Sequence, residues 1–240
     1  THKKMLAKHA SKIIAVSNNT KNDIVKILKI DSNKIEVVHL ASSLINVVPE
    51  HVKRLPKKYI LFIGRRDFYK NFTRFLTAFS QVVKNEHNLN IVCVGGDKLS
   101  HQEIKTIESY GLLQKVTHIE RVSDNQLTYI YQNALAFIFP SLYEGFGMPI
   151  LEAFGCGCPV ACSNTSSFTE IAQDSALYFD PTDTSSIVKA IETITRNNLI
   201  RKRLRALGFI SVKKYSWEKT AKKTLNLYYN TLSHYASTHR

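Results

Sequence analysis

Two glutamates lie eight positions apart in the segment PSLYEGFGMPILEAFGCGCPV, which spans residues 140–160. Glu144 precedes a Gly-Phe-Gly turn, and Glu152 follows a proline. Pro149 suits the first turn of a helix, because its φ angle is fixed and it has no amide to leave unpaired. The N-terminus of such a helix carries free amides and a partial positive charge, which favour an anion such as a phosphate.

The two carboxylates would therefore lie on either side of this anion. Because carboxylates are themselves negative, they do not bind the phosphate and must bind groups attached to it. Glu144 lies in the loop, and we expect Glu152 in the first helical turn. The natural partners of the two carboxylates are hydroxyls on either side of a diphosphate, a sugar on one side and a ribose on the other. Gly145 and Gly147 would allow the backbone to approach that ligand closely. A carboxylate in a first helical turn could instead simply complement the helix dipole.

Short apolar runs alternate with helical patterns along the chain. Near-continuous apolar runs are typical of strands buried on both faces of a parallel sheet. Pro140 follows one such run, so the glutamate loop lies at the carboxyl end of a strand, where open α/β sheets bind ligands. We predict an α/β fold with a Rossmann-like parallel sheet flanked by helices and a helical C-terminal tail. The expected strands are 12–16, 34–38, 59–64, 90–95, 115–119, 135–139, 159–162 and 176–179.

The pattern predicts three parts. Residues 1–45 hold too few elements for an independent core, so we expect the end of a preceding domain and the start of a linker. Residues 46–214 form the Rossmann-like domain, and residues 215–240 form a helix whose apolar face requires a cover. That face comprises Trp217, Ala221, Leu225, Tyr228, Tyr229 and Leu232.

The composition is that of a globular protein, with 44% hydrophobic and 22% charged residues. No apolar run approaches the roughly 18 residues of a membrane-spanning helix, and no signal peptide is evident. We expect a cytoplasmic protein. Three of the four cysteines fall within residues 156–162, yet no second Cys/His pair stands at ligand spacing. They predict small, reduced, buried thiols rather than a zinc site.

The formal net charge is +14, concentrated in patches at 2–12, 53–58 and 196–205. A basic surface attracts phosphates of any kind, whether of nucleic acid, anionic lipid or a nucleotide. We expect peripheral contact with anionic membrane at its inner face and no specific nucleic acid. A solvated basic face without a partner remains an alternative.

The segment at 140–160 resembles the signature of retaining GT-B glycosyltransferases of family four, also called glycosyl transferases group one, with its E-x7-E pair. Further blocks resemble this family in order along residues 59–220. A lone E-x7-E pair would carry no information, whereas six ordered blocks are specific. The other blocks are ILFIGRRDFYKN, IVCVGG, VTHIERVSDNQLTYIYQNALAFIFPS, SNTSSFTEIAQDSALYFDPTD and YSWEKTA.

The resemblance implies the donor-binding half of an enzyme that moves a mannose- or glucose-type hexose from a GDP- or UDP-linked sugar. The acceptor, a glycan or a lipid-linked sugar, would be held by the preceding domain. Arg65 and Lys70 match the basic pair that holds the diphosphate and stabilises the charge of the leaving group. Glu144 matches a glutamate at the donor sugar and Glu152 one at the ribose. Other implied donor contacts are Gly64, Phe146, Gly147, Met148 and Ile150, with Arg121, Val122 and Ser123 beside the nucleobase.

Local explanations compete at several of these positions. Arg66 could replace Arg65 if the loop register shifts by one residue. Ser123 forms a capping box with the glutamine three positions later, which would explain its polarity. His39 and His118 adjoin expected strands and are predicted to be structural or surface histidines rather than ligands.

The sequence contains no D-x-D motif of the kind that holds a divalent ion in the other large glycosyltransferase fold. A helix N-terminus with Arg65 and Lys70 would neutralise the diphosphate instead, so we expect no metal and no cofactor beyond the substrate. Two other functions remain open: an isomerase of the nucleotide-sugar epimerase type, and a non-catalytic module that binds phosphates or nucleic acid.

Overall fold

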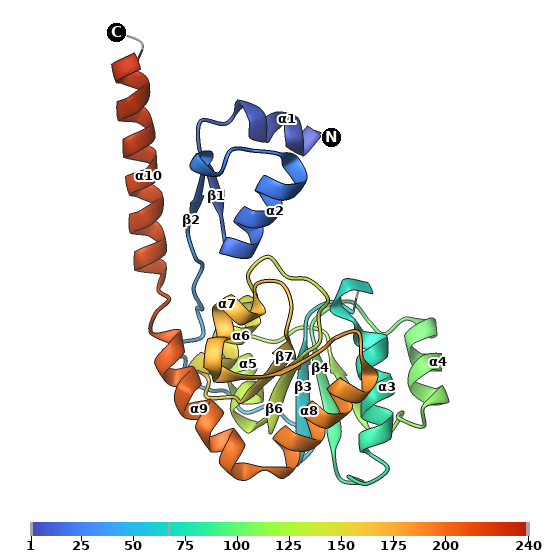
Figure 1. The fold of residues 1–240 in the computed structure, drawn as a ribbon. Coiled ribbons are helices and arrows are strands. Elements are labelled where there is room, and N and C mark those ends of the chain that lie inside the picture. The colour runs from blue at the N-terminus through green and yellow to red at the C-terminus, as the bar shows by residue number, and fades with distance from the viewer. Residues whose placement is uncertain (1, 67, 239–240) are drawn as a thin grey trace.

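The computed structural model describes residues 2–66 and 68–238. Within them, six parallel strands form the main sheet in the order β5-β4-β3-β6-β7-β8 (Figure 1). Each strand end lies within one residue of its expected position, which confirms the predicted sheet. The strands are β3 (Tyr59–Ile63), β4 (Asn90–Val94), β5 (Val116–Ile119), β6 (Ala136–Phe139), β7 (Val160–Ser163) and β8 (Ala176–Phe179).

Helices cover both faces of this sheet. Successive residues of a strand point to opposite faces, so a strand that is apolar throughout must be covered on both sides. Tyr59 and Leu61 of β3 pack among α5, α6 and α7, whereas Ile60 and Phe62 pack among α3, α4 and α8. The helices are α3 (Phe72–Val82), α4 (His101–Ser109), α5 (Asp124–Asn133), α6 (Met148–Gly155), α7 (Phe168–Ala172), α8 (Thr184–Arg196) and α9 (Asn198–Val212), with the short 3-10 helices η2 (Phe68–Lys70) and η3 (Gln173–Ser175).

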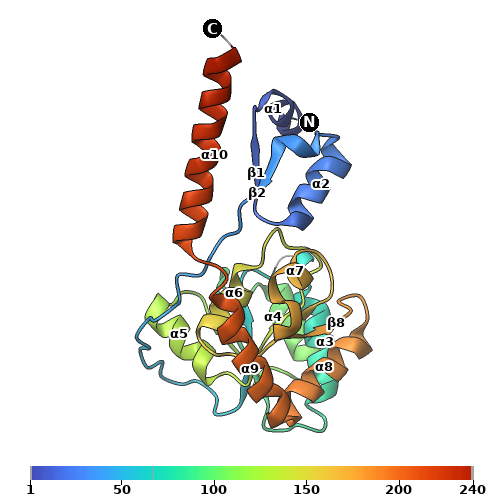
Figure 2. The ribbon, with the colours of Figure 1, turned by 60° about the vertical axis from the view of Figure 1, so that its left-hand side comes forward.

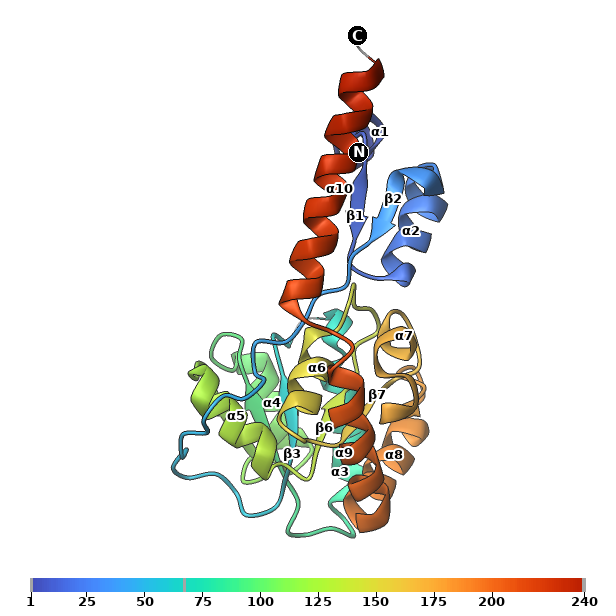
Figure 3. The same ribbon diagram turned by 90° about the vertical axis from the view of Figure 1, so that its left-hand side faces the viewer.

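A small unit precedes the main sheet. Strands β1 (Ile13–Ala15) and β2 (Ile35–Val37) pair in parallel, and Ala15, Ile30 and Ile35 form their buried cluster. Figures 2 and 3 show this unit above the end of the main domain that carries α7. The remaining elements of this unit are α1 (His2–His9), α2 (Asn18–Leu28) and the 3-10 helix η1 (Ser32–Lys34).

The C-terminal helix α10 (Trp217–Thr238) leaves the main domain and runs beside the small unit (Figure 2). Thr220 Oγ1 donates a hydrogen bond of 2.7 Å to the carbonyl of His39. Further along the helix, a groove of about 580 Å³ separates Leu227 and Tyr228 from Ala10 and Ile14. The apolar residues Leu225, Tyr228, Tyr229 and Leu232 are exposed.

The segment at 38–58 contains no helix or strand, as expected of a linker. It nevertheless packs on the main domain, where Leu44 is buried in the same cluster as α6. Asn125 donates to the Val48 carbonyl over 2.8 Å and accepts from the Glu50 amide over 3.0 Å. The linker is therefore held along the domain rather than extended away from it.

The four cysteines are buried, and none of them forms a disulfide bond. Burial raises the pKa of the Cys93 thiol to about 12, and burial likewise raises the pKa of Cys156 to about 12. They remain thiols at neutral pH and act as small apolar side chains.

Candidate functional site

Lys70 and Glu144 form an ion pair at the carboxyl end of the main sheet. Lys70 ends η2, which follows β3, and Glu144 lies in the loop after the neighbouring strand β6. The Lys70 Nζ atom lies 2.7 Å from Glu144 Oε1, and the two side chains are 12% and 16% exposed. Since both charges are largely withdrawn from water, removal of either one leaves the other without its compensation.

A glycine with a positive φ angle lies next to this lysine. Gly64 follows β3 with a φ angle of 113°, in the region that favours glycine. A Cβ atom there would lie 3.5 Å from Lys70 Nζ. The lysine ammonium also lies 5.0 Å from the centre of the Phe139 ring at the end of β6. The backbone conformation explains glycine at this position, because a Cβ atom would be only in ordinary contact with the lysine.

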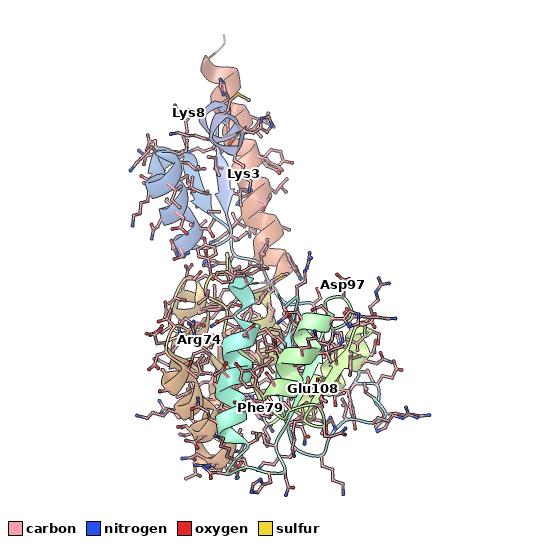
Figure 4. The ribbon with its side chains drawn as sticks, turned by 90° about the vertical axis from the view of Figure 1, so that its right-hand side faces the viewer. Lys3, Lys8, Arg74, Phe79, Asp97 and Glu108 are labelled. Carbon is pink, nitrogen blue, oxygen red and sulfur yellow. The ribbon has the colours of Figure 1, made fainter. Side chains whose placement is uncertain are left out.

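The guanidinium of Arg66 is held by the structure. Its side chain is only 5% exposed, and its Nε atom lies 2.6 Å from Glu103 Oε1. Arg66 also donates to the carbonyls of Gly95 over 3.0 Å and Asp97 over 2.6 Å. Figure 4 shows Asp97 at the end of the main domain nearest the small unit. Arg66 therefore fastens the loop after β3 to the loop after β4.

Arg65 occupies a different environment from Arg66. Both arginines line a cavity of about 400 Å³ with Gly96 and Lys98, but Arg65 is exposed, whereas the Arg66 side chain is almost fully buried. His118 Nε2 lies 3.1 Å from Arg66 Nη1 and 3.1 Å from the Gly95 carbonyl, which places this histidine in the structural network. Of the two arginines, Arg65 is the better placed for a ligand.

Two serines hold the loop from Glu144 to Gly147 by hydrogen bonds to its backbone. Ser166 Oγ donates to the Glu144 carbonyl over 2.5 Å and accepts from the Glu144 amide over 3.0 Å. Ser167 Oγ lies 2.9 Å from the carbonyls of both Glu144 and Phe146. These serines immediately precede α7, so the start of that helix determines the path of the loop.

Helix α6 begins beside this loop. Gly147 has a φ angle of 94° and is the residue before the first turn, with Pro149 in that turn. Met148 is 41% exposed, whereas Ile150 and the Phe146 side chain are buried. Phe146 and Ile150 could therefore meet a ligand only through their backbone.

The position of Glu152 differs from the expectation. Because α6 begins at Met148, Glu152 is its fifth residue and the first turn contains no acidic residue. The dipole explanation for this carboxylate is thereby weakened, since the effect falls off within the first turn. Burial raises the pKa of Glu152, although a hydrogen bond of 3.0 Å from the Tyr131 hydroxyl opposes the shift. A partly buried carboxylate with one protein donor can accept further donors from a ligand.

The segment expected to frame a nucleobase follows β5. Arg121 and Ser123 are exposed, and Val122 packs against the core. The predicted capping box is present, because Ser123 Oγ accepts from the Gln126 amide over 3.2 Å while Gln126 Oε1 accepts from the Ser123 amide over 3.2 Å. The hydroxyl and amide of Ser123 therefore both take part in capping the N-terminus of α5.

Three side chains that shape this site had no role in the prediction from sequence. Tyr131 belongs to the apolar pattern of α5, so nothing in the sequence indicated its hydroxyl as a partner of Glu152. Ser166 and Ser167 stand in the block SNTSSFTE, whose density of hydroxyls was the available signal. Their partners in the loop lie more than 20 positions away along the chain.

Comparison with known proteins identifies relatives. The family described as Glycosyl transferases group 1 matches residues 46–208. The O-antigen chain mannosyltransferase B of Escherichia coli is 29% identical over 230 residues, which are 91% of this chain and 60% of that protein. The O-antigen chain mannosyltransferase RfbU of Salmonella typhimurium is 33% identical over 192 residues, 80% of this chain and 53% of its own. The chain thus spans less than two thirds of these relatives.

Solved structures share the fold. Sucrose-phosphate synthase from Thermosynechococcus elongatus superposes with a TM-score of 0.82 over 97% of this chain and 61% of its own, at 22% identity. This likeness confirms the expected architecture, the C-terminal half of a GT-B fold with a helical tail.

Proposed function

Because the chain belongs to the family of glycosyl transferases group 1, we propose that it forms the donor-binding half of a retaining hexosyltransferase. The donor is a nucleoside-diphosphate sugar and the acceptor a glycan or a lipid-linked sugar. The observation that carries this proposal is the Lys70–Glu144 pair at the loop that precedes α6, with the partly buried Glu152 further along that helix. The names of the two O-antigen mannosyltransferases favour mannose as the sugar.

Each charged side chain has a task in this proposal. Arg65, Lys70 and the amides before α6 hold the diphosphate, and they compensate the negative charge that grows on it as the sugar leaves. Glu144 faces the donor sugar near the reacting carbon. Glu152 accepts hydrogen bonds from the ribose hydroxyls. In this arrangement the ligand replaces the Lys70–Glu144 contact with its own phosphate and hydroxyl groups.

The transfer retains configuration at the sugar carbon. The bond from that carbon to the phosphate oxygen breaks, and a bond to the acceptor oxygen forms on the same face. The acceptor proton passes to the departing phosphate oxygen, so no side chain of this chain is required as the base. The basic groups at Arg65 and Lys70 then hold the released nucleoside diphosphate.

The acceptor side of the proposal concerns the small unit. We assign residues 1–45 to the end of the acceptor-binding domain and the start of the linker, residues 46–214 to the donor domain, and residues 215–240 to a helix that returns to the acceptor side. The separate two-stranded sheet and the course of α10 beside it support this division.

Nucleotide binding without metal is the first expected result. The described residues contain no group of three or more His, Cys, Asp or Glu side chains that could hold an ion. Arg65, Lys70 and the α6 amides supply the positive charge instead, so we expect calorimetric titration in EDTA to show saturable binding of one nucleotide family. The titrants are GDP, UDP and ADP with their mannose, glucose and N-acetylglucosamine conjugates.

The outcomes of this titration separate two claims. Binding that disappears in EDTA and returns with magnesium or manganese would refute metal independence and leave the donor site intact. Absence of binding by every nucleotide, with and without metal, would contradict the proposed function itself.

We further propose that the protein contacts an anionic membrane through α9. None of the helices in the described residues is long and apolar enough to cross a membrane. Figure 3 shows α9 on the outside of the main domain. No acidic residue lies between Glu192 and Glu218, and α9 exposes Lys202 and Arg203 beside Leu199 and Ile210, which are 77% and 62% exposed. Exposed apolar and basic side chains on one helix favour the surface of an anionic bilayer.

Reversing two of these charges is expected to release the protein. The variant Lys202→Glu/Arg203→Glu should bind phosphatidylglycerol-containing vesicles at least about 30-fold more weakly, because each basic residue near the surface contributes about 1 kcal/mol and the new carboxylates are repelled by the anionic lipid. Vesicle flotation measures this, with Lys3→Glu/Lys4→Glu in α1 as the matched change elsewhere. Equal flotation of the wild type with neutral and anionic vesicles would refute the contact.

A further inference from the structure

The small unit touches the glutamate loop directly. Ser17, which caps the N-terminus of α2, donates a hydrogen bond of 2.6 Å to the carbonyl of Gly145. Thr20 Oγ1 donates to the same carbonyl over 3.0 Å. Ser17 is fully buried. Two hydroxyls from a segment more than 120 positions away therefore hold one carbonyl of the loop.

Successive carbonyls of this loop are held in the same way. Ser166 and Ser167 bind the Glu144 carbonyl, Ser17 and Thr20 bind the Gly145 carbonyl, and Ser167 binds the Phe146 carbonyl. Only one of these three carbonyls depends on hydroxyls from the small unit. The other two depend on the start of α7, which belongs to the same domain as the loop.

A held carbonyl also orients the next amide. In a planar trans peptide, the C=O of one residue and the N–H of the next point in opposite directions. The three held carbonyls therefore turn the amides of Gly145, Phe146 and Gly147 away from the hydroxyls. Across the part of the chain that the structure describes, no residue accepts a hydrogen bond from these three amides. Backbone amides without a protein acceptor are available to an anion.

We propose that Ser17 and Thr20 are positioning residues of the donor site. By holding the Gly145 carbonyl, they aim the Phe146 amide at the diphosphate-sugar end of the donor and keep Glu144 beside Lys70. The small unit thus completes a site that belongs to the main domain. This inference rests on the proposed function, because it assigns a new role within the same site.

Other contacts attach α2 to the main domain without touching this carbonyl. Glu170 of α7 accepts from the Asn18 amide over 3.0 Å and the Asn19 amide over 3.2 Å, and His39 Nε2 lies 2.8 Å from it. Burial opposes ionisation of Glu170, but hydrogen bonds from Asn18, His39 and Asn19 outweigh it and hold its pKa below the ordinary value. A Glu170 variant therefore serves as the control, because it weakens the attachment of α2 to the main domain without affecting the Gly145 carbonyl.

The test compares two ligands of one base, the nucleoside-diphosphate sugar and the nucleoside monophosphate. In the variant Ser17→Ala/Thr20→Val, we expect the affinity for the nucleotide sugar to fall about tenfold, the loss of two hydrogen bonds that fix one carbonyl. The affinity for the monophosphate, which depends on Glu152 and the base contacts, should be retained. Thr20→Ser keeps a hydroxyl and Glu170→Gln leaves the carbonyl untouched, so both should bind the nucleotide sugar as the wild type does.

Three results would overturn the inference: wild-type affinity for the nucleotide sugar in the double variant, equal losses for both ligands, or an equal loss in Glu170→Gln. Should the double variant fail to fold, the pair Thr20→Val and Thr20→Ser decides, because only Thr20→Val should lose affinity. A wild-type chain that binds no nucleotide would refute the proposed function and this inference with it. Wild-type binding with an unaffected double variant would refute the inference alone.

Discussion

Replacement of Lys70 by methionine is expected to lower the rate of sugar transfer by about 100- to 1,000-fold, the effect of removing one group that stabilises transition-state charge. Methionine preserves much of the side-chain length but cannot compensate the charge of the departing diphosphate. Initial rates of transfer by the complete enzyme measure the effect. Lys84→Met, at an exposed lysine of the same domain, is the matched control.

The Lys70 variant also leaves Glu144 without its partner, so its stability must be separated from its activity. The double variant Lys70→Met/Glu144→Gln removes both charges of the ion pair. We expect it to recover the melting temperature lost in Lys70→Met while remaining inactive. A Lys70→Met enzyme with wild-type rate, or a double variant that regains activity, would contradict the role given to this lysine.

Replacement of Glu152 by glutamine is expected to weaken donor binding about 100-fold, because hydrogen bonds to a charged group contribute about 1.5–3 kcal/mol. The same change should stabilise the protein. Burial raises the pKa of Glu152, so ionisation at neutral pH destabilises the folded state, and this penalty disappears as the pH falls through that raised pKa. Glutamine removes the penalty at neutral pH. A gain of about 1 kcal/mol would raise Tm by about 2–4 °C.

Calorimetry and thermal melting of the same samples test both halves of this prediction. Glu108→Gln is the control, at an exposed position on α4 (Figure 4). Binding to nucleic acid should remain as it is in the wild type, because phosphate contacts by lysine and arginine do not involve Glu152. Retained nucleotide-sugar affinity, or a lower Tm, in Glu152→Gln would show that this carboxylate serves the fold rather than the ligand.

The sheet was predictable because its signal is local. Each strand is a short apolar run, and Pro140 and Gly64 mark the ends of two of them. The start of α6 was predicted less well. Pro149 indicated the first turn, but Gly147 as the residue before the helix places Met148 first and moves Glu152 into the second turn.

Contacts between distant segments left no local signal. Arg65 and Arg66 are adjacent and chemically alike, and only the packing of the β3 and β4 loops shows that Arg66 is bound to Glu103 and two carbonyls. In the same way, nothing near Ser17 in the sequence indicates that its hydroxyl reaches Gly145. The family resemblance proposed the candidate site residues, whereas the structure supplied the contacts that hold them.

The most direct test of the donor site is a crystal structure of the chain with the nucleoside diphosphate that it binds most tightly. We expect the ribose hydroxyls on Glu152 and the diphosphate at the amides before α6, within reach of Arg65 and Lys70. Lys70 should then contact a phosphate oxygen in place of Glu144. A nucleotide bound elsewhere, with the Lys70–Glu144 pair and Glu152 free of ligand, would contradict the central claim.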